Sequence, residues 1–267
     1  MTDDPVTVER KFGSLSEYSI QVNRWILKPI GAWPSSNSTT NREKFISWIL
    51  NVICWCFSLF TIIPGVLNIL LEKEDLYLKL KMFGPLSHWC VGGFNYAVLL
   101  LRQGDIHYCI KHIRTDWKTI TRLEDQRVML KNAKLGRYIA CFCAAFMHGS
   151  VFCTCLVLGA FKRTIEVRNE TILVYTLPCP AYKLPVQTNP GHDIILGTQF
   201  LSAFIATSSA AGAFSLATVF ASHALGQLNI MVTWINEFVN QHSKDQNNNA
   251  RANKIGVIVE HHLRALR

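Results

Sequence analysis

The side chains in this sequence that could bind a metal or act in catalysis are mainly cysteines and histidines. The nine cysteines include three Cys-x-Cys pairs, which begin at Cys54, Cys141 and Cys153. Residues two positions apart on a helix do not face each other, so we interpret these cysteines as small packing residues rather than metal ligands. The Glu-His-His run that begins at Glu260 is excluded as a metal site for the same geometric reason.

Signatures of enzymes are missing from the sequence. It has no G-x-x-x-x-G-K-[ST] phosphate loop, no H-E-x-x-H pair and no G-x-S-x-G nucleophile elbow. We interpret Asp116, which precedes Trp117, as a capping or ion-pair residue rather than a catalytic acid. We therefore predict that the protein is not an enzyme and uses neither a metal nor a cofactor.

The remaining polar residues suggest recognition of a small molecule. His148 is accompanied by Phe142 and Phe146, and residues 202–212 are rich in Ser, Thr, Ala and Gly. Small residues let helices approach closely, and hydroxyl groups form hydrogen bonds between helices. A mostly apolar cavity with a few polar contacts would suit a small volatile molecule. Ordinary helix packing is the alternative explanation for the same residues.

These side chains lie on or beside four long apolar stretches, 45–71, 82–101, 138–161 and 194–222, which contain no Lys, Arg, Asp or Glu. Each is long enough to cross a bilayer, which takes roughly 20 apolar residues, and backbone groups in lipid must be paired within a helix. We predict an all-α integral membrane protein, a helical bundle with four transmembrane helices. The bundle comprises residues 45–222. Residues 1–44 are predicted to be a cytosolic segment with an amphipathic helix, and residues 223–267 a cytosolic helical extension and truncated tail.

The net charge of +9 is interpreted as a signal of membrane topology. Basic residues are concentrated in segments 1–44, 102–137 and 223–267, which alternate with the other polar segments. The positive-inside rule then places the N-terminus in the cytosol, and no nucleic-acid partner is needed to explain the charge. The sequon at Asn169 falls in a segment predicted to be outside and is the expected glycosylation site, whereas the sequon at Asn37 disagrees with this orientation.

Two polar segments have helical patterns of their own. Residues 14–34 predict an amphipathic helix that ends at Pro29 and a turn up to Pro34, with the apolar face on either the membrane surface or other protein. Segment 102–137 keeps a helical spacing of apolar residues, so we expect the second membrane helix to continue into the cytosol. The spaced residues are Ile106, Cys109, Ile110, Ile113, Trp117, Ile120 and Leu123.

The last apolar stretch is longer than a membrane requires. Residues 194–236 contain no Lys, Arg, Asp or Glu, so the helix must outrun the bilayer or break. A further amphipathic pattern begins near Asn253 and is still running at Arg267. Because no helix stop signal follows, we expect the sequence to be a fragment.

Four short motifs, taken in order against the apolar stretches, resemble the insect odorant receptor family, most closely its members from ants, bees and wasps. They are a Gly-x-Trp-Pro element at 31–34, the Asp-Trp pair at 116–117 that follows 109–113, a His-x-x-Gly-Gln-Leu pattern at 223–228, and a Val-x-x-His stretch from Val259. The resemblance covers nearly the whole chain and rests on the order and spacing of the motifs.

The resemblance implies seven membrane spans, of which four are present here, with a cytosolic N-terminus. It also implies assembly with an odorant co-receptor into a tetrameric, odorant-gated cation channel, located as a multi-pass protein in the plasma membrane of sensory neurons. The pore-lining span of the family has no counterpart in this chain. The expected partners are a small hydrophobic odorant, the co-receptor subunit and membrane lipid.

The resemblance also implies an odorant pocket among the outer halves of three spans. The residues assigned to it are Ser87, His88, Val91, Met147, Ser150, Val151, Thr154, Phe200 and Phe204. His148 faces either this pocket or a neighbouring helix. Two other functions remain open: a four-helix membrane adaptor or transporter subunit unrelated to receptors, and a taste-type receptor of the same superfamily.

Overall fold

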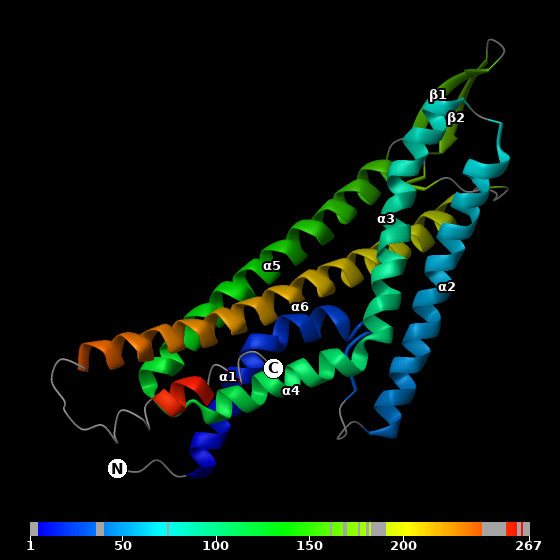
Figure 1. The fold of residues 1–267 in the computed structure, drawn as a ribbon. Helices are drawn as coiled ribbons and strands as arrows, with labels where there is room; N and C mark the ends of the chain where they lie inside the picture. Colours follow the sequence, from blue (N-terminus) through cyan, green and yellow to red (C-terminus); the bar gives the residue numbers. More distant parts are fainter. Residues whose placement is uncertain are drawn as a thin grey trace. The chain divides into compact units, whose positions relative to one another are not determined.

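The structure is a computed structural model, and it is helical apart from one β-hairpin (Figure 1). It describes residues 5–35, 40–73, 75–160, 162–167, 170–175, 177–179, 182, 191–241, 255–260 and 263. The elements in chain order are α1 (Pro5–Leu27), α2 (Asn41–Leu71), α3 (Leu76–Leu101), α4 (Gln103–Thr119), α5 (Leu123–Ala160), β1 (Lys162–Val167), β2 (Glu170–Tyr175) and α6 (Gly191–Gln241). The predicted helical fold is thus confirmed, with the hairpin as an addition.

Three helices are long and apolar enough to cross a membrane: α2, α5 over Leu123–Cys155, and α6 over Gly191–Asn240. This indicates a membrane protein. In α6, 67% of the most apolar stretch is buried against protein, compared with 17% in α2 and 11% in α5. The apolar stretch of α6 is therefore mostly covered by protein, whereas α2 and α5 expose apolar side chains such as Phe60 and Phe146.

The second predicted span lies on α3, which is not among those three helices. Its sequence includes Gly84, Pro85, His88 and Asn95, which lower its mean hydropathy. Two polar side chains of α3 have partners in the fold: Ser87 Oγ donates to the carbonyl of Gly84 at 2.6 Å, and His88 contacts a hydroxyl on α6. Mean hydropathy treats every side chain as exposed to lipid. It therefore underestimates the ability of a helix to cross a membrane when its polar groups are paired within the protein.

The chain forms two compact units. Unit 1 comprises Met1–Val22, Tyr108–Cys141 and Ser215–Arg267, and unit 2 comprises Asn23–His107 and Phe142–Phe214. The boundaries fall within α1, α4, α5 and α6, so each of these helices contributes to both units. Each unit therefore contains segments that are distant in sequence.

The first helix ends as its sequence predicts. α1 stops at Leu27, two residues before Pro29, and the chain turns through Gly31, which has a φ of 70°. Leu27 and Ile30 are fully buried, with Leu27 against Gly212 of α6, whereas Trp25 is 63% exposed. The apolar face at this end of α1 therefore packs mainly on protein, and Trp25 is left outside.

The turn after α1 is fastened to α2 and α3 by hydrogen bonds. Tyr96 Oη donates to the carbonyl of Ile30 at 2.7 Å, and Ser47 Oγ donates to that of Gly31 at 2.9 Å. The phenol has only one proton, so the Asn51 amide nitrogen must donate to Tyr96 Oη (3.0 Å) and also to the carbonyl of Gly31 (3.1 Å). A side chain at position 31 would meet the Asn51 side chain and the Ser47 carbonyl, so this turn requires glycine.

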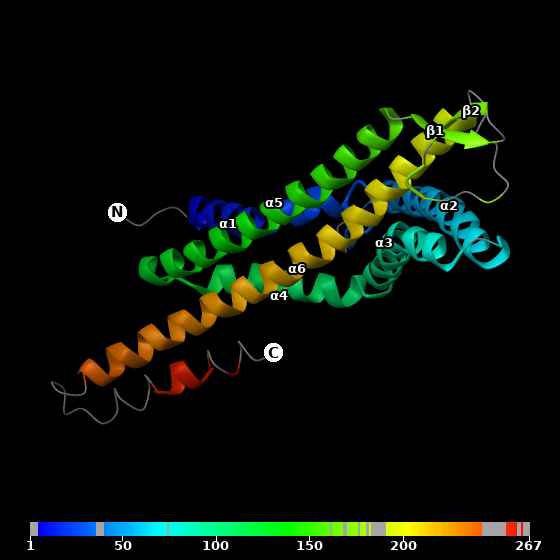
Figure 2. The same cartoon turned by 90° about the horizontal axis from the view of Figure 1, so that it is seen from above.

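Two features of the connections differ from the expectations. The second predicted span does not continue as one helix, because α3 ends at Leu101 and Arg102 has a non-helical ψ of 16° before α4 begins. The segment after α5 departs from the all-α prediction, because it forms the antiparallel hairpin in which Lys162 pairs with Tyr175 and Val167 with Glu170 (Figure 2). Half of the residues in each strand are β-branched, and this enrichment was the available signal.

The last helix outruns a bilayer, as predicted. α6 runs unbroken for 51 residues, which at 1.5 Å per residue is about 77 Å, against about 30 Å of hydrocarbon. Beyond α6, residues 255–260 are again helical. The asparagines of the two sequons, Asn37 and Asn169, lie outside the described residues.

Candidate functional site

A polar belt joins α3, α5 and α6 within unit 2. It is built around three successive hydroxyl residues of α6, Thr207, Ser208 and Ser209, each at most 1% exposed. Close approach is possible because Gly92 of α3 faces Ala206 of α6, where a Cβ on Gly92 would lie 2.7 Å from the Ala206 Cα. Ser209 Oγ then lies 2.8 Å from the carbonyls of both Gly92 and Ala206, and its single proton is shared between these two acceptors. The glycine thus sets the distance between the two helices.

The other two hydroxyls of the belt contact histidines. Thr207 Oγ1 lies 3.2 Å from His88 Nε2 of α3, and Ser208 Oγ lies 2.9 Å from His148 Nε2 of α5. His148 Nδ1 is 2.8 Å from the carbonyl of Ala144. A carbonyl can only accept, so Nδ1 donates to it, and in the tautomer that carries its proton on Nδ1 the Nε2 atom accepts from Ser208. His148 therefore faces a neighbouring helix.

A cluster of buried side chains adjoins the belt in unit 2: Leu86, Trp89, Cys179, Ala203 and Ala206, with Val151 packed against them. The Gln199 side chain holds Cys179 there, accepting from its backbone N–H (3.1 Å) and donating to its carbonyl (2.9 Å). Burial raises the pKa of the Cys179 thiol to about 12. The thiol is therefore protonated at neutral pH and is unsuited to nucleophilic chemistry.

Two buried polar atoms have no hydrogen-bond partner among the described residues. They are the indole Nε1 of Trp89 and the hydroxyl of Ser202, which is 0% exposed. An unpaired polar group in an apolar interior costs about 1–3 kcal/mol, so each marks a place where a polar ligand atom or a water would stabilise the fold. Trp89 was not singled out from the sequence, because its place in an apolar helix gives no signal of an unpaired N–H.

The residues assigned to the odorant pocket are only partly brought together. His88 joins the belt, Val151 joins the cluster, and the Phe204 ring lies 5.0 Å from the His148 ring. The others are half-buried or exposed; Ser87, Met147 and Phe200 belong to the first group, and Val91, Ser150 and Thr154 to the second. No contact in the structure tests whether these residues bind a ligand, so the assignment stays a prediction.

A carboxylate between two imidazoles lies in unit 1. Asp116 of α4 is 4% exposed, and its Oδ2 is 2.9 Å from His223 Nε2 of α6 and 3.1 Å from His112 Nδ1. The neighbouring Trp117 is 1% exposed. Asp116 is thus an ion-pair or hydrogen-bond partner, as its interpretation from the sequence proposed, and it joins α4 to α6.

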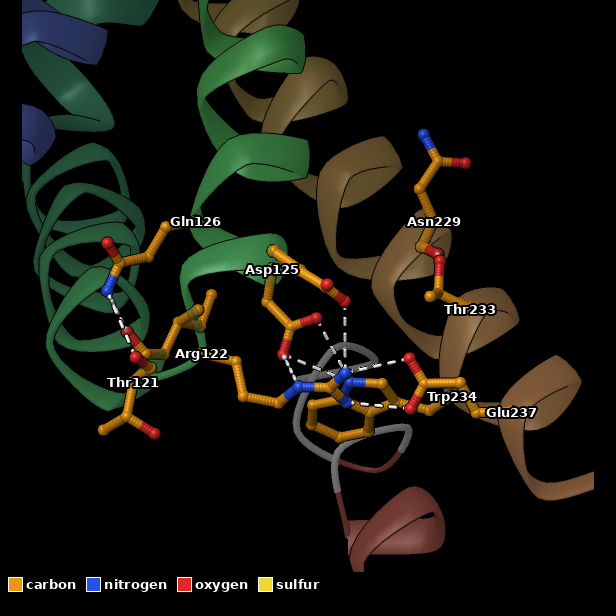
Figure 3. Close-up of polar contacts among 10 residues, drawn as sticks. Thr121, Arg122, Asp125, Gln126, Asn229, Thr233, Trp234 and Glu237 are labelled. Carbon is orange, nitrogen blue, oxygen red and sulfur yellow. Dashed lines mark hydrogen bonds and ion pairs between the residues drawn. The ribbon is translucent and has the colours of Figure 1, made fainter. Parts of the chain in front are cut away.

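An arginine hub connects the link before α5 with α6, also in unit 1 (Figure 3). The Arg122 guanidinium donates to both carboxylate oxygens of Glu237, at 2.8 and 3.0 Å, and lies 3.9 Å from Asp125. Asp125, 2% exposed, accepts from Trp234 Nε1 at 3.1 Å. Burial raises the pKa of the Asp125 carboxyl, and the Arg122 charge offsets only part of that effect.

The hub borders an open pocket of about 220 Å³. Its lining includes Thr119, Thr121, Arg122, Asp125, Trp234 and Glu260. Sequence reasoning did not find this network, because Arg122 and Glu237 are 115 residues apart and each is an ordinary surface residue by its local pattern. Among the described residues, no group of three or more His, Cys, Asp or Glu side chains could hold a metal ion.

Comparison with models of known protein families and with curated protein sequences gave no match. The site is therefore interpreted from its own geometry. That geometry consists of a neutral belt with two unpaired polar atoms in unit 2, and of charged contacts in unit 1.

Proposed function

We propose that this protein is an odorant receptor subunit. In this proposal it binds small hydrophobic volatile molecules among its membrane helices. As part of a seven-span receptor with an odorant co-receptor, it gates a cation channel in the plasma membrane of sensory neurons. It acts by binding, without catalysis and without a cofactor.

The observation that carries the proposal is the contact between Asp116 and His223. These residues belong to two of the motifs on which the family resemblance rests, and they lie 107 positions apart in the sequence. The adjoining motif residues Trp117 and Gln227 are buried as well. Two motifs that matched the family by chance would not be expected to contact each other in a buried site. The contact between them therefore supports the resemblance.

The proposal includes a fourth span and an orientation. α3 has 26 residues, which at 1.5 Å per residue is about 39 Å, enough for a bilayer core. Its polar residues His88 and Tyr96 have partners inside the protein. With α3 crossing, the positive-inside rule places the N-terminus and α4 in the cytosol. Attachment of a glycan at Asn169, and none at Asn37, is the expected result of glycosylation mapping.

The unpaired atoms of unit 2 suggest the chemistry of the ligand. Trp89 Nε1 can only donate a hydrogen bond, and the Ser202 hydroxyl can donate or accept. The surrounding cluster is apolar. A small hydrophobic molecule with a single oxygen acceptor, such as an ester, ketone or aldehyde, matches this combination.

The test is an odorant-evoked current. The seven-span form of the receptor, which includes the pore-lining span, is expressed with its co-receptor, and currents are recorded against a panel of volatile esters, ketones, alcohols and alkanes. We expect acceptor-bearing compounds to activate it. Trp89→Phe should lower sensitivity about tenfold, because it removes one hydrogen bond and keeps the ring.

Trp55→Phe serves as the matched control, because Trp55 packs on Tyr96, whose centroid is 5.6 Å away, and is not in the cluster. Surface labelling must show normal delivery of each variant. A correctly delivered receptor that gives no current with any compound would refute the proposed function. Equal responses to alkanes and esters would refute the proposed role of Trp89.

A further inference from the structure

A group of basic and aromatic side chains, most of them exposed, surrounds the junction of α1 and α2 in unit 2. We name it the basic collar, and its residues are Arg24, Trp25, Lys28, Arg42, Lys44, Phe45 and Trp48. Trp25, Phe45 and Trp48 are 63%, 61% and 61% exposed, and Lys28, Arg42 and Lys44 are exposed as well. The proposed function makes no use of these residues.

The turn after α1 holds the two parts of the basic collar together. Ser47, on the second turn of α2, donates to the carbonyl of Gly31, so the end of α1 cannot leave the start of α2 without breaking this bond. The Arg24 guanidinium lies over the ring of Trp33 in the same turn, 5.5 Å from its centroid. The basic side chains of α1 are thus fixed relative to those of α2.

The charge of the basic collar is strongly positive. Residues 24–48 contain four basic residues and a single acid, Glu43. The Glu43 carboxylate already accepts from the backbone N–H of Thr40, at 3.4 Å, as part of the cap of α2. The surface therefore attracts anions.

The basic collar also lies at a sharp boundary between polar and apolar sequence. From residue 45 to residue 71 there is no charged residue, so Lys44, in the first turn of α2, is the last charge before the apolar stretch of that helix. Phe45 and Trp48 stack with centroids 6.2 Å apart on this boundary. Aromatic side chains favour the headgroup level of a bilayer, and basic side chains next to them reach the phosphates.

We propose that the basic collar binds the phosphate-bearing headgroups of anionic membrane lipids in the leaflet that faces the N-terminus. Exposed rings beside the cations favour a lipid over a free anion, because a soluble phosphate would leave Phe45 and Trp48 in water. The bound lipid holds the end of α1 at the membrane surface. The turn that follows α1 is hydrogen-bonded to α2 and α3 at the same place. This proposal requires only that α2 crosses a membrane.

The test measures lipid binding by the full chain in a neutral detergent. A short-chain phosphatidylserine is titrated into the protein, and its affinity is compared with that of the matching phosphatidylcholine. Each basic residue near an anionic headgroup strengthens binding about fivefold. The triple variant Lys28→Gln/Arg42→Gln/Lys44→Gln should therefore bind phosphatidylserine about a hundredfold more weakly, and salt should weaken binding to the original chain.

The matched control is Lys73→Gln/Lys79→Gln/Lys81→Gln, which removes the same number of charges from the link after α2 and from the first turns of α3. It should bind phosphatidylserine as the original chain does. Equal weakening by both triple variants would overturn the proposal, as would no weakening by the first. Competition by inorganic phosphate as strong as that by the lipid would show a site for free anions and would also overturn it.

A second readout applies if the triple variant does not fold. Trp48→Leu keeps the charge and the apolar character but removes the indole. It should reduce the amount of phosphatidylserine that co-purifies with the protein from mixed bilayers, and leave co-purified phosphatidylcholine unchanged. Unchanged retention of phosphatidylserine would count against the basic collar. Neither outcome depends on a response to odorants, so the two proposals fail separately.

Discussion

Helices α5 and α6 run through both compact units, but each unit holds them with a different chemistry. In unit 2 the contacts are neutral: Ser208 pairs with His148, and Ser209 with a backbone carbonyl. In unit 1 the contacts are charged or ionisable, with Arg122 on Glu237 and Asp116 on His223. A charge at the centre of a bilayer costs about 2.5–3.5 kcal/mol even in an insertion assay, so neutral pairs suit helices that cross lipid.

The comparison also concerns distance. The belt of unit 2 needs close helix contact, because hydroxyl side chains are short and bond only when Gly92 lets α3 approach α6. The hub of unit 1 spans its gap with the long side chains of Arg122 and Glu237. We therefore expect unit 2 to respond most to added volume and unit 1 to lost charge.

The largest expected effect is that of Gly92→Ala. The added methyl group would meet Ala206 at both its Cβ and its Cα, and a backbone atom can give way only if the helices separate. We expect a loss of about 3 kcal/mol of stability, measured by thermal unfolding in detergent. Gly93→Ala is the control, since its methyl group would meet only the Ile62 Cδ1, at 3.4 Å. Equal losses would show that Gly92 does not set the helix distance.

Arg122→Met should have the next largest effect, in unit 1. It removes the cation from Glu237 and leaves the buried Asp125 carboxylate without its neutralising neighbour. Since Arg122 is 44% exposed, water screens part of the interaction, and we expect a loss of about 2 kcal/mol rather than the 3–5 kcal/mol of a fully buried pair. Arg127→Met, at an exposed position of α5, should cost much less. The reverse order would exclude a stabilising role for the hub.

The charge of Asp125 predicts a dependence on pH. Its pKa is raised above 3.8 in the folded protein, mainly by burial, so the folded state takes up a proton more readily than the unfolded chain. The contribution of Asp125 to stability must then increase as the pH falls from neutral through the raised pKa, and be complete below 3.8. The difference in unfolding temperature between the original chain and Asp125→Asn should follow this course. A difference that decreases on acidification would contradict the raised pKa.

The sequence predicted the helices well, because exclusion of charge from 45–71, 138–161 and 194–222 follows directly from the cost of charge in lipid. It also predicted the end of α1, because proline at 29 fixes where a helix can stop. It did not predict the hairpin, because the β-branched residues of β1 and β2 are partly adjacent in sequence and do not alternate with a period of two.

The tertiary contacts of individual side chains could not be predicted from the sequence. Which face of α3 meets α6 depends on the fit of Gly92 on Ala206, and only that fit decides that Trp89 is buried while Val91 is 58% exposed. Asp116 and His223 could each be recognised as motif residues, but helical periodicity carries no information about a contact across 107 residues. Local sequence patterns therefore predict the helices, whereas the candidate site is determined by the packing of helices that are distant in sequence.

The smallest expected effect is a difference in stability between alanine variants of two serines in unit 2. Ser208→Ala removes the bond to His148 and should cost about 0.6 kcal/mol, the average for hydrogen bonds between membrane helices. Ser202→Ala should be neutral or stabilising, because that buried hydroxyl has no partner among the described residues. Both measurements use the same unfolding assay and the same chemical change, so helix propensity and volume cancel between them.

With an activating ester bound, the difference between the two losses of stability should become smaller or change sign. The Ser202 hydroxyl can then donate to the ester oxygen, which alanine cannot do. A destabilising Ser202→Ala in the absence of any ligand would mean that the hydroxyl is already paired, and the argument for an oxygen-bearing ligand in unit 2 would rest on Trp89 alone.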